Sequence, residues 1–133
     1  ELWSNALDFI SNNFFIGCGI GNWKIQSLPY WSKLNIGYVV PYHAHNDFLE
    51  IFTELGIFGF ISYLSIFFIC FFKLFKLLYK YHIIALHFFI FLSLSVYFID
   101  AFFNFPLERT LMQLSFSFII SLILFQSKFK NVT

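Results

Sequence analysis

Three mainly apolar runs, at residues 56–72, 83–99 and 111–125, constrain this chain more than any other feature. None of them contains Asp, Glu, Lys, Arg or Pro. The runs are 15 to 17 residues long, and at ~1.5 Å rise per residue they approach the thickness of the bilayer hydrocarbon. Charged residues make up only 11% of the chain, against about 25% in an average soluble domain. The pattern excludes a water-soluble globular domain and predicts an all-α integral membrane fold with three transmembrane helices.

The charges are divided unevenly among the connections, and this division predicts a topology. Five lysines follow the first run or the last run, whereas all seven acids lie in the other connections or at their membrane edges. By the positive-inside rule, the lysine-bearing connections face the cytoplasm. The predicted segments are an outer loop at 1–56, a span at 57–72, a cytoplasmic loop at 73–82, a span at 83–99, an outer turn at 100–110, a span at 111–125 and a cytoplasmic tail at 126–133.

The outer loop is expected to contain a short amphipathic helix followed by irregular segments. One helical face of residues 2–10 carries its apolar side chains, and Asn12 and Asn13 are expected to end the helix. Gly17, Gly19 and Gly21 predict a flexible turn. The residues of the apolar face are Leu2, Trp3, Ala6, Leu7 and Ile10.

Residues 23–42 are predicted to be irregular and are rich in tryptophan and tyrosine. These rings suit either an aromatic belt at the lipid headgroups or a sugar-stacking surface, and we favour the belt.

Titratable side chains gather immediately before the first apolar run. His43, His45 and Glu50 lie there with Asn46 and Asp47. Such groups are costly to hold at the mouth of a membrane helix, so they are candidates for function. Asn46 or Asp47 is expected to cap the helix, and Asp47 with Glu50 resembles a capping box. The positive end of the helix favours neutral imidazole at His45 and attracts phosphate.

Alternative roles remain for several of these residues. A metal site is not predicted, because position 49 is Leu and supplies no second ligand at helical spacing. No cofactor is expected. His43 either orients an acceptor or hydrogen-bonds its own loop, and we favour the loop. Asn46 either binds an acceptor or caps the helix, and we favour the cap.

Two further features lie at the edges of the apolar runs. Gly56 and Gly59 form a small-residue stripe that is predicted to pack the helix against its neighbours. Glu108 and Arg109 are expected to serve as interfacial anchors or as an ion pair. Arg109 is alternatively a diphosphate contact, because a guanidinium binds phosphate with two parallel hydrogen bonds.

The spacing of the histidine segment resembles a known family. His45-Asn46, nine residues and then Gly56-Ile57-Phe58-Gly59 is similar to the histidine motif of the O-antigen ligase and polymerase superfamily, which are bacterial membrane glycosyltransferases. Residues 2–7, 15–23 and 105–109 also look like stretches of that family. The resemblance covers nearly the whole chain and implies a C-terminal fragment of a longer protein.

The resemblance implies a reaction and a set of partners. His45 would be the catalytic base, acting on an undecaprenyl-diphosphate-linked glycan donor and on a glycan or lipid-core acceptor. Membrane lipids are further partners, and no nucleic acid is expected. The family's arginine clamp has only Arg109 as a counterpart here, so the fragment is expected to be inactive alone. The implied substrate contacts are His43, Asn46, Glu50 and Arg109.

The implied location is the bacterial inner membrane, with a multi-pass topology and the site on the periplasmic or extracellular side. The sequence does not separate a ligase from a polymerase of surface polysaccharide. The alternative function is a non-catalytic polysaccharide transport or export protein. It is disfavoured because the spans hold no charged residue or proline that would mark a substrate pathway.

Overall fold

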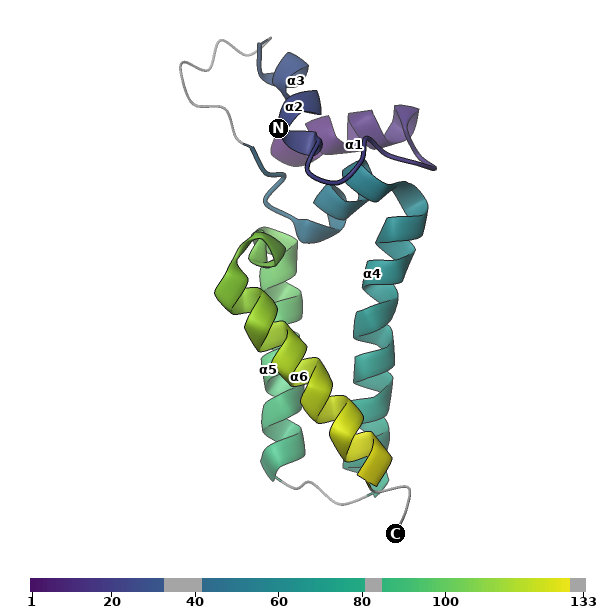
Figure 1. The fold of residues 1–133 in the computed structure, drawn as a ribbon, viewed down its shortest axis with the longest axis vertical. Coiled ribbons are helices and arrows are strands. Elements are labelled where there is room, and N and C mark those ends of the chain that lie inside the picture. The colour runs from purple at the N-terminus through teal and green to yellow at the C-terminus, as the bar shows by residue number, and fades with distance from the viewer. Residues whose placement is uncertain (33–41, 81–84, 130–133) are drawn as a thin grey trace. The chain divides into compact units, whose positions relative to one another are not determined.

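The computed structural model describes residues 1–32, 42–80 and 85–129, and in these ranges it is helical with no strand (Figure 1). The all-α prediction is therefore confirmed. The elements are α1 (Leu2–Asn12), α2 (Trp23–Gln26), α3 (Leu28–Ser32), α4 (Asp47–Lys80), α5 (Ala85–Phe103), the 3-10 helix η1 (Pro106–Glu108) and α6 (Thr110–Phe129).

Three of these helices, α4, α5 and α6, are long and apolar enough to cross a membrane. The stretches that satisfy this description are Asp47–Tyr79, Ala85–Phe103 and Thr110–Lys128. No more than 28% of any apolar window is buried inside the chain. Most of the apolar side chains therefore face outward, where contact with hydrocarbon is favourable.

The helices extend further than the predicted spans. Residues 73–80, predicted as a loop, continue α4, while α5 reaches Phe103 and α6 covers Thr110–Phe129. The loop was placed by charge alone, but lysine is a good helix former whose long stem carries its charge toward water. The Lys73 Nζ atom donates to Ser127 Oγ at 3.5 Å. Residues 81–82 and 130–133, predicted to be cytoplasmic, and residues 83–84, predicted to begin the second span, lie outside the described residues.

The chain forms two compact units. The first unit comprises residues 1–64 and 101–105, and the second comprises residues 65–100 and 106–133.

The first unit has a small core made by α1, α2 and the segment before α4. Trp23 is 1% exposed and packs with Ala6, Phe9 and Ala44. The rings of Phe9 and Trp23 meet edge to face at 5.6 Å between centroids. Because Trp23 is buried in this core, it belongs neither to an aromatic belt nor to a sugar-stacking surface.

Two predictions for the outer loop are corrected by this core. The buried face of α1 consists of Ala6, Phe9 and Ile10, whereas Leu7, expected on that face, is 55% exposed. The contact with Trp23 selects Phe9 for burial. The segment after residue 22 is not wholly irregular, because it forms α2 and α3. Residues 33–41 and the side chain of Trp31 lie outside the described part.

The second unit is held by aromatic packing between its helices. The rings of Tyr97 and Phe116 stack at 4.3 Å with an interplanar angle of 6°, and buried Phe67 stacks on Phe116 at 5.2 Å. Such pairs stabilise by about 0.5–1.5 kcal/mol beyond their buried area.

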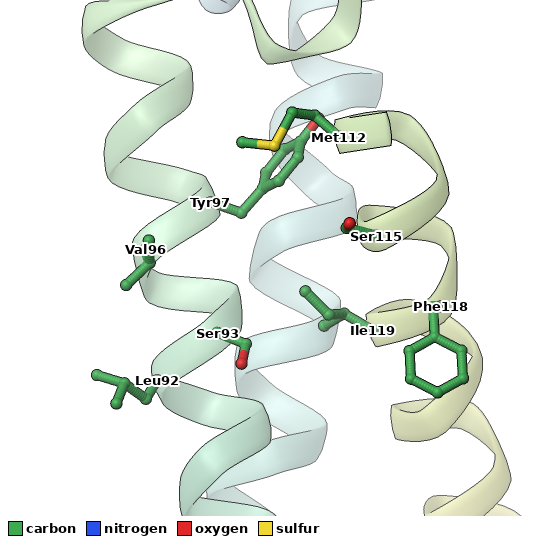
Figure 2. A pocket seen from close by; sticks show the side chains of 8 residues that line it. All are labelled: Leu92, Ser93, Val96, Tyr97, Met112, Ser115, Phe118 and Ile119. Atoms are coloured by element: carbon green, nitrogen blue, oxygen red, sulfur yellow. The ribbon is translucent and has the colours of Figure 1, made fainter. Parts of the chain in front are cut away.

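Next to this packing, α5 and α6 line an open cavity of about 500 Å³ (Figure 2). Its serine hydroxyls are used within their own helices: Ser93 donates to the Phe89 carbonyl and Ser115 to the Leu111 carbonyl, each at 2.8 Å. The cavity therefore presents a mainly apolar wall. Its lining residues are Leu92, Ser93, Val96, Tyr97, Met112, Ser115, Phe118 and Ile119.

Candidate functional site at the mouth of the first membrane helix

A break at Gly56 divides α4 into a short first part, residues 47–55, and a long apolar part that begins at Ile57. Gly56 has φ 67° and ψ −165°, which no residue inside a helix adopts. A helix end leaves backbone N–H or C=O groups without partners in the helix. The break therefore creates two such ends close together, and both need hydrogen bonds from elsewhere.

The glycine loop, residues 14–22, supplies those hydrogen bonds. The N–H groups of Cys18 and Gly19 donate to the carbonyls of Thr53 and Glu54 at 2.9 and 2.7 Å. In the opposite direction, the Ile57 N–H donates to the Phe14 carbonyl at 2.9 Å. The loop thus satisfies the end of the first part of α4 and the start of the apolar part.

This arrangement requires glycine at two positions, Gly17 in the glycine loop and Gly56 at the break in α4. Gly17 has φ 70°, and a Cβ added there would lie 2.6 Å from backbone atoms of Thr53 and Glu54. A Cβ added at Gly56 would collide with the backbone of Phe15. The prediction of a flexible turn is therefore wrong, because the glycine loop is fixed against α4 by close backbone contact.

Gly56 and Gly59 have different surroundings from those that the small-residue stripe suggested. The nearest atoms to an added Cβ at Gly56 belong to the backbone of Phe15 and Ile16, not to another helix. At Gly59 the nearest atoms belong to Leu55, one turn earlier in α4. The closest contacts of both glycines are thus made near the break, and their packing against a neighbouring helix stays a prediction.

Asn46 caps the first part of α4. Its Oδ1 accepts from the Leu49 N–H at 3.1 Å, and the residue is only 4% exposed. The favoured interpretation of Asn46 as the cap is confirmed. Asp47, the alternative candidate for the cap, accepts from the Tyr63 hydroxyl through its Oδ2 at 3.4 Å.

Glu50 joins the first part of α4 to the segment before it, and it does not complete a capping box with Asp47. Its Oε1 is 2.8 Å from Nδ1 of His43, and its Oε2 accepts from the Ala44 N–H at 3.0 Å. Its side chain is 8% exposed, and a buried carboxylate needs such donors. His43, expected to hydrogen-bond its own loop, instead has its hydrogen-bond partner in α4.

His45 has an unusual backbone conformation. Its φ is 51°, and in the described part of the chain it is the one residue other than glycine with a positive φ. Histidine tolerates this region better than most residues, but the conformation still costs about 1–3 kcal/mol and often marks a functional site. Its neighbours hold it there: Ala44 is in the core and Asn46 caps α4.

Phe105 contacts both imidazoles from a distant part of the sequence. The His43 ring stacks on it at 4.6 Å and 17°, and the His45 ring meets its edge at 4.8 Å and 86°. Sequence reasoning noted Phe105 only as part of a turn similar to the family's. No local pattern connects it with residues 43–45, so its contact with the histidines was missed.

Arg109 belongs to the second unit. It is exposed, and its carbonyl accepts from the N–H groups of Met112 and Gln113 at 2.9 and 3.0 Å as α6 begins. Its predicted contact with a diphosphate stays a prediction.

The thiol and the phenol beside the core are not suited to proton transfer at neutral pH. Burial, followed by the charge of Glu54, raises the pKa of the Cys18 thiol. Burial, followed by the charge and hydrogen bond of Asp8, raises the pKa of Tyr30. Both groups therefore stay protonated near neutral pH.

These features define a class: an integral membrane protein with a histidine-bearing site at the mouth of a broken transmembrane helix. Residues 1–64 match a family model described as O-antigen ligase. Over these residues the match confirms the resemblance inferred from the histidine motif. Searches of curated proteins and of solved structures returned no match to the chain.

Replacing Gly17 with Ala should disrupt the contact between the glycine loop and α4. The new Cβ meets backbone atoms at 2.6 Å, so we expect a loss of several kcal/mol in the free energy of unfolding. Gly21→Ala is the matched control, because Gly21 has φ 74° but no atom within 4 Å of an added Cβ. Thermal unfolding in detergent should rank Gly17→Ala well below Gly21→Ala, and equal midpoints would contradict the close contact.

Removing the carboxylate of Glu50 should destabilise the segment before α4. Glu50→Leu leaves the buried Ala44 N–H without its acceptor, which costs about 1–3 kcal/mol. Glu50→Gln keeps an acceptor oxygen and should lose less. The measurement is the unfolding midpoint of each purified variant, and a Glu50→Leu variant as stable as the parent would refute the assigned role.

Proposed function

We propose that the chain is part of a membrane glycosyltransferase of the O-antigen ligase or polymerase type. In this proposal it transfers a glycan from an undecaprenyl-diphosphate-linked donor to the hydroxyl of a glycan or lipid-core acceptor. The site lies on the outer face of the bacterial inner membrane, and His45 is the general base. The family match over residues 1–64 supports a membrane glycosyltransferase role in general.

One observation carries the choice of His45. It lies in the matched segment, directly before the Asn46 cap, in a backbone conformation that costs free energy and that the surrounding contacts maintain. A strained conformation at the mouth of a helix indicates selection for the position of a side chain. Connecting the preceding segment to α4 does not by itself require an imidazole at position 45.

The proposed chemistry needs a base more than an acid. The acceptor hydroxyl oxygen forms a bond to the anomeric carbon, and the bond from that carbon to the diphosphate oxygen breaks. The diphosphate leaves with the electron pair, and the hydroxyl proton passes to the imidazole of His45. A positioned base of this kind contributes about 10²–10⁴-fold to the rate. If His45 acts on the face opposite the leaving group, the anomeric configuration inverts.

The helix mouth also suits the charge of the donor. The N-terminus of a helix carries about half a positive charge and points N–H groups outward, so it attracts phosphate. The first part of α4 places this end beside His45. In the proposal, a base and a phosphate-attracting group thus share one short segment, and Arg109 is a further candidate contact to the diphosphate.

The hydrogen bonds already made limit how the neighbours can contact substrate. Asn46 uses its carbonyl oxygen for the cap, so a contact to the acceptor would come from its amide nitrogen. His43 is held through Nδ1 by Glu50, so a contact would come from Nε2. In this proposal Glu50 acts by positioning His43 and Ala44.

Substitutions at His45 should abolish formation of the surface polysaccharide in cells that carry the intact protein. His45→Asn is the decisive variant, because asparagine tolerates positive φ but cannot act as a base at neutral pH. We expect a loss of at least about 10²-fold in polysaccharide at unchanged protein level.

His43→Gln provides the comparison, since glutamine can still donate a hydrogen bond to Glu50. It should retain more polysaccharide than His45→Asn. Normal polysaccharide in the His45→Asn strain would contradict the assignment of the base.

A further inference from the structure

The end of the glycine loop exposes an apolar surface that the proposed reaction does not use. Phe15, Ile16 and Ile20 are 65%, 83% and 79% exposed. We call these three residues the apolar tip. Residues 14–21 contain no charged side chain. Three large apolar side chains exposed within one short loop that carries no charge indicate an interaction site.

The apolar tip is fixed to the start of the apolar part of α4. The hydrogen bonds from Cys18 and Gly19 to Thr53 and Glu54 hold the loop at the break. From there, aromatic rings continue the contact toward the span. Phe14 meets Phe15 at 5.3 Å and Phe52 at 5.4 Å, and Phe52 stacks on Phe60 at 5.0 Å.

The backbone beside the apolar tip uses many of its polar groups internally. The Gly17 N–H donates to the Asn13 carbonyl at 3.2 Å, and the Asn22 N–H donates to the Gly19 carbonyl at 3.1 Å. The Asn22 side-chain amide donates to the Cys18 carbonyl at 3.0 Å. Irregular backbone is tolerated near hydrocarbon only when such groups have partners. This loop therefore suits a boundary between lipid and water.

We propose that the apolar tip inserts into the outer boundary of the bilayer, with lipid hydrocarbon as its partner. The surface of the span supports lipid over a protein partner, because it continues from the break with exposed Phe58 and Ile61. The tip thereby fixes the depth of the first part of α4. If the proposed function holds, this places His45 at the level of the headgroups, where a lipid-linked diphosphate lies.

Spin-label accessibility in phospholipid vesicles tests the insertion. The intact protein carries Cys18→Ser and Cys70→Ser, with a single label at Ile16→Cys or Ile20→Cys. Two paramagnetic probes are compared: oxygen, which partitions into hydrocarbon, and a polar nickel chelate, which stays in water. The lipid control is Phe58→Cys, and the water control is Ser11→Cys at the exposed end of α1.

Labels at Ile16 and Ile20 should resemble the Phe58 label, with several-fold higher accessibility to oxygen than the Ser11 label and lower accessibility to nickel. Accessibility to nickel like that of Ser11 would overturn the proposal. Protection from both probes would also overturn it, because protein would then cover the tip. The readout does not involve polysaccharide formation, so this proposal and the proposed function fail separately.

Discussion

The hydrogen bonds that the glycine loop makes at Gly56 are the constraint on which the rest of the first unit depends. A helix broken at its entry to the membrane has unpaired N–H and C=O groups, which are costly where water is scarce. Here the groups on both sides of the break have partners in residues 14–19. The first part of α4 can therefore take a direction of its own, and the mouth of the helix becomes a separate short element that carries the histidines.

That short element is held at several points. The Glu50 carboxylate holds His43 and Ala44, Asn46 caps the helix, and Phe105 contacts both imidazole rings. With its neighbours fixed, His45 keeps a left-handed backbone conformation that a mobile loop would lose. A positioned base needs this kind of support, because a small displacement from the reacting atoms lowers the rate steeply.

The sequence predicted the local features of this arrangement well. The apolar runs predicted the three spans, and the residues around position 46 predicted a capped helix mouth. The long-range contacts could not be predicted from the sequence. The glycine loop contacts residues of α4 that lie more than thirty positions later in the sequence, and Phe105 contacts histidines that lie about sixty positions earlier. The charges of Lys73 and Lys76 led to the prediction of a loop, but α4 continues through both residues. In α1, Phe9 rather than Leu7 is buried, because Trp23 from another helix selects it.

Amide hydrogen exchange tests the central claim most directly. The account predicts that the amides of Cys18, Gly19 and Ile57, which hold the glycine loop against the break, exchange slowly in the intact protein. They should be protected by at least about tenfold relative to the amide of Ser4 in the exposed first turn of α1, because the first N–H groups of a helix have no partner within it. Exchange of all four amides at the same fast rate would contradict the account, because the glycine loop would then be free of α4.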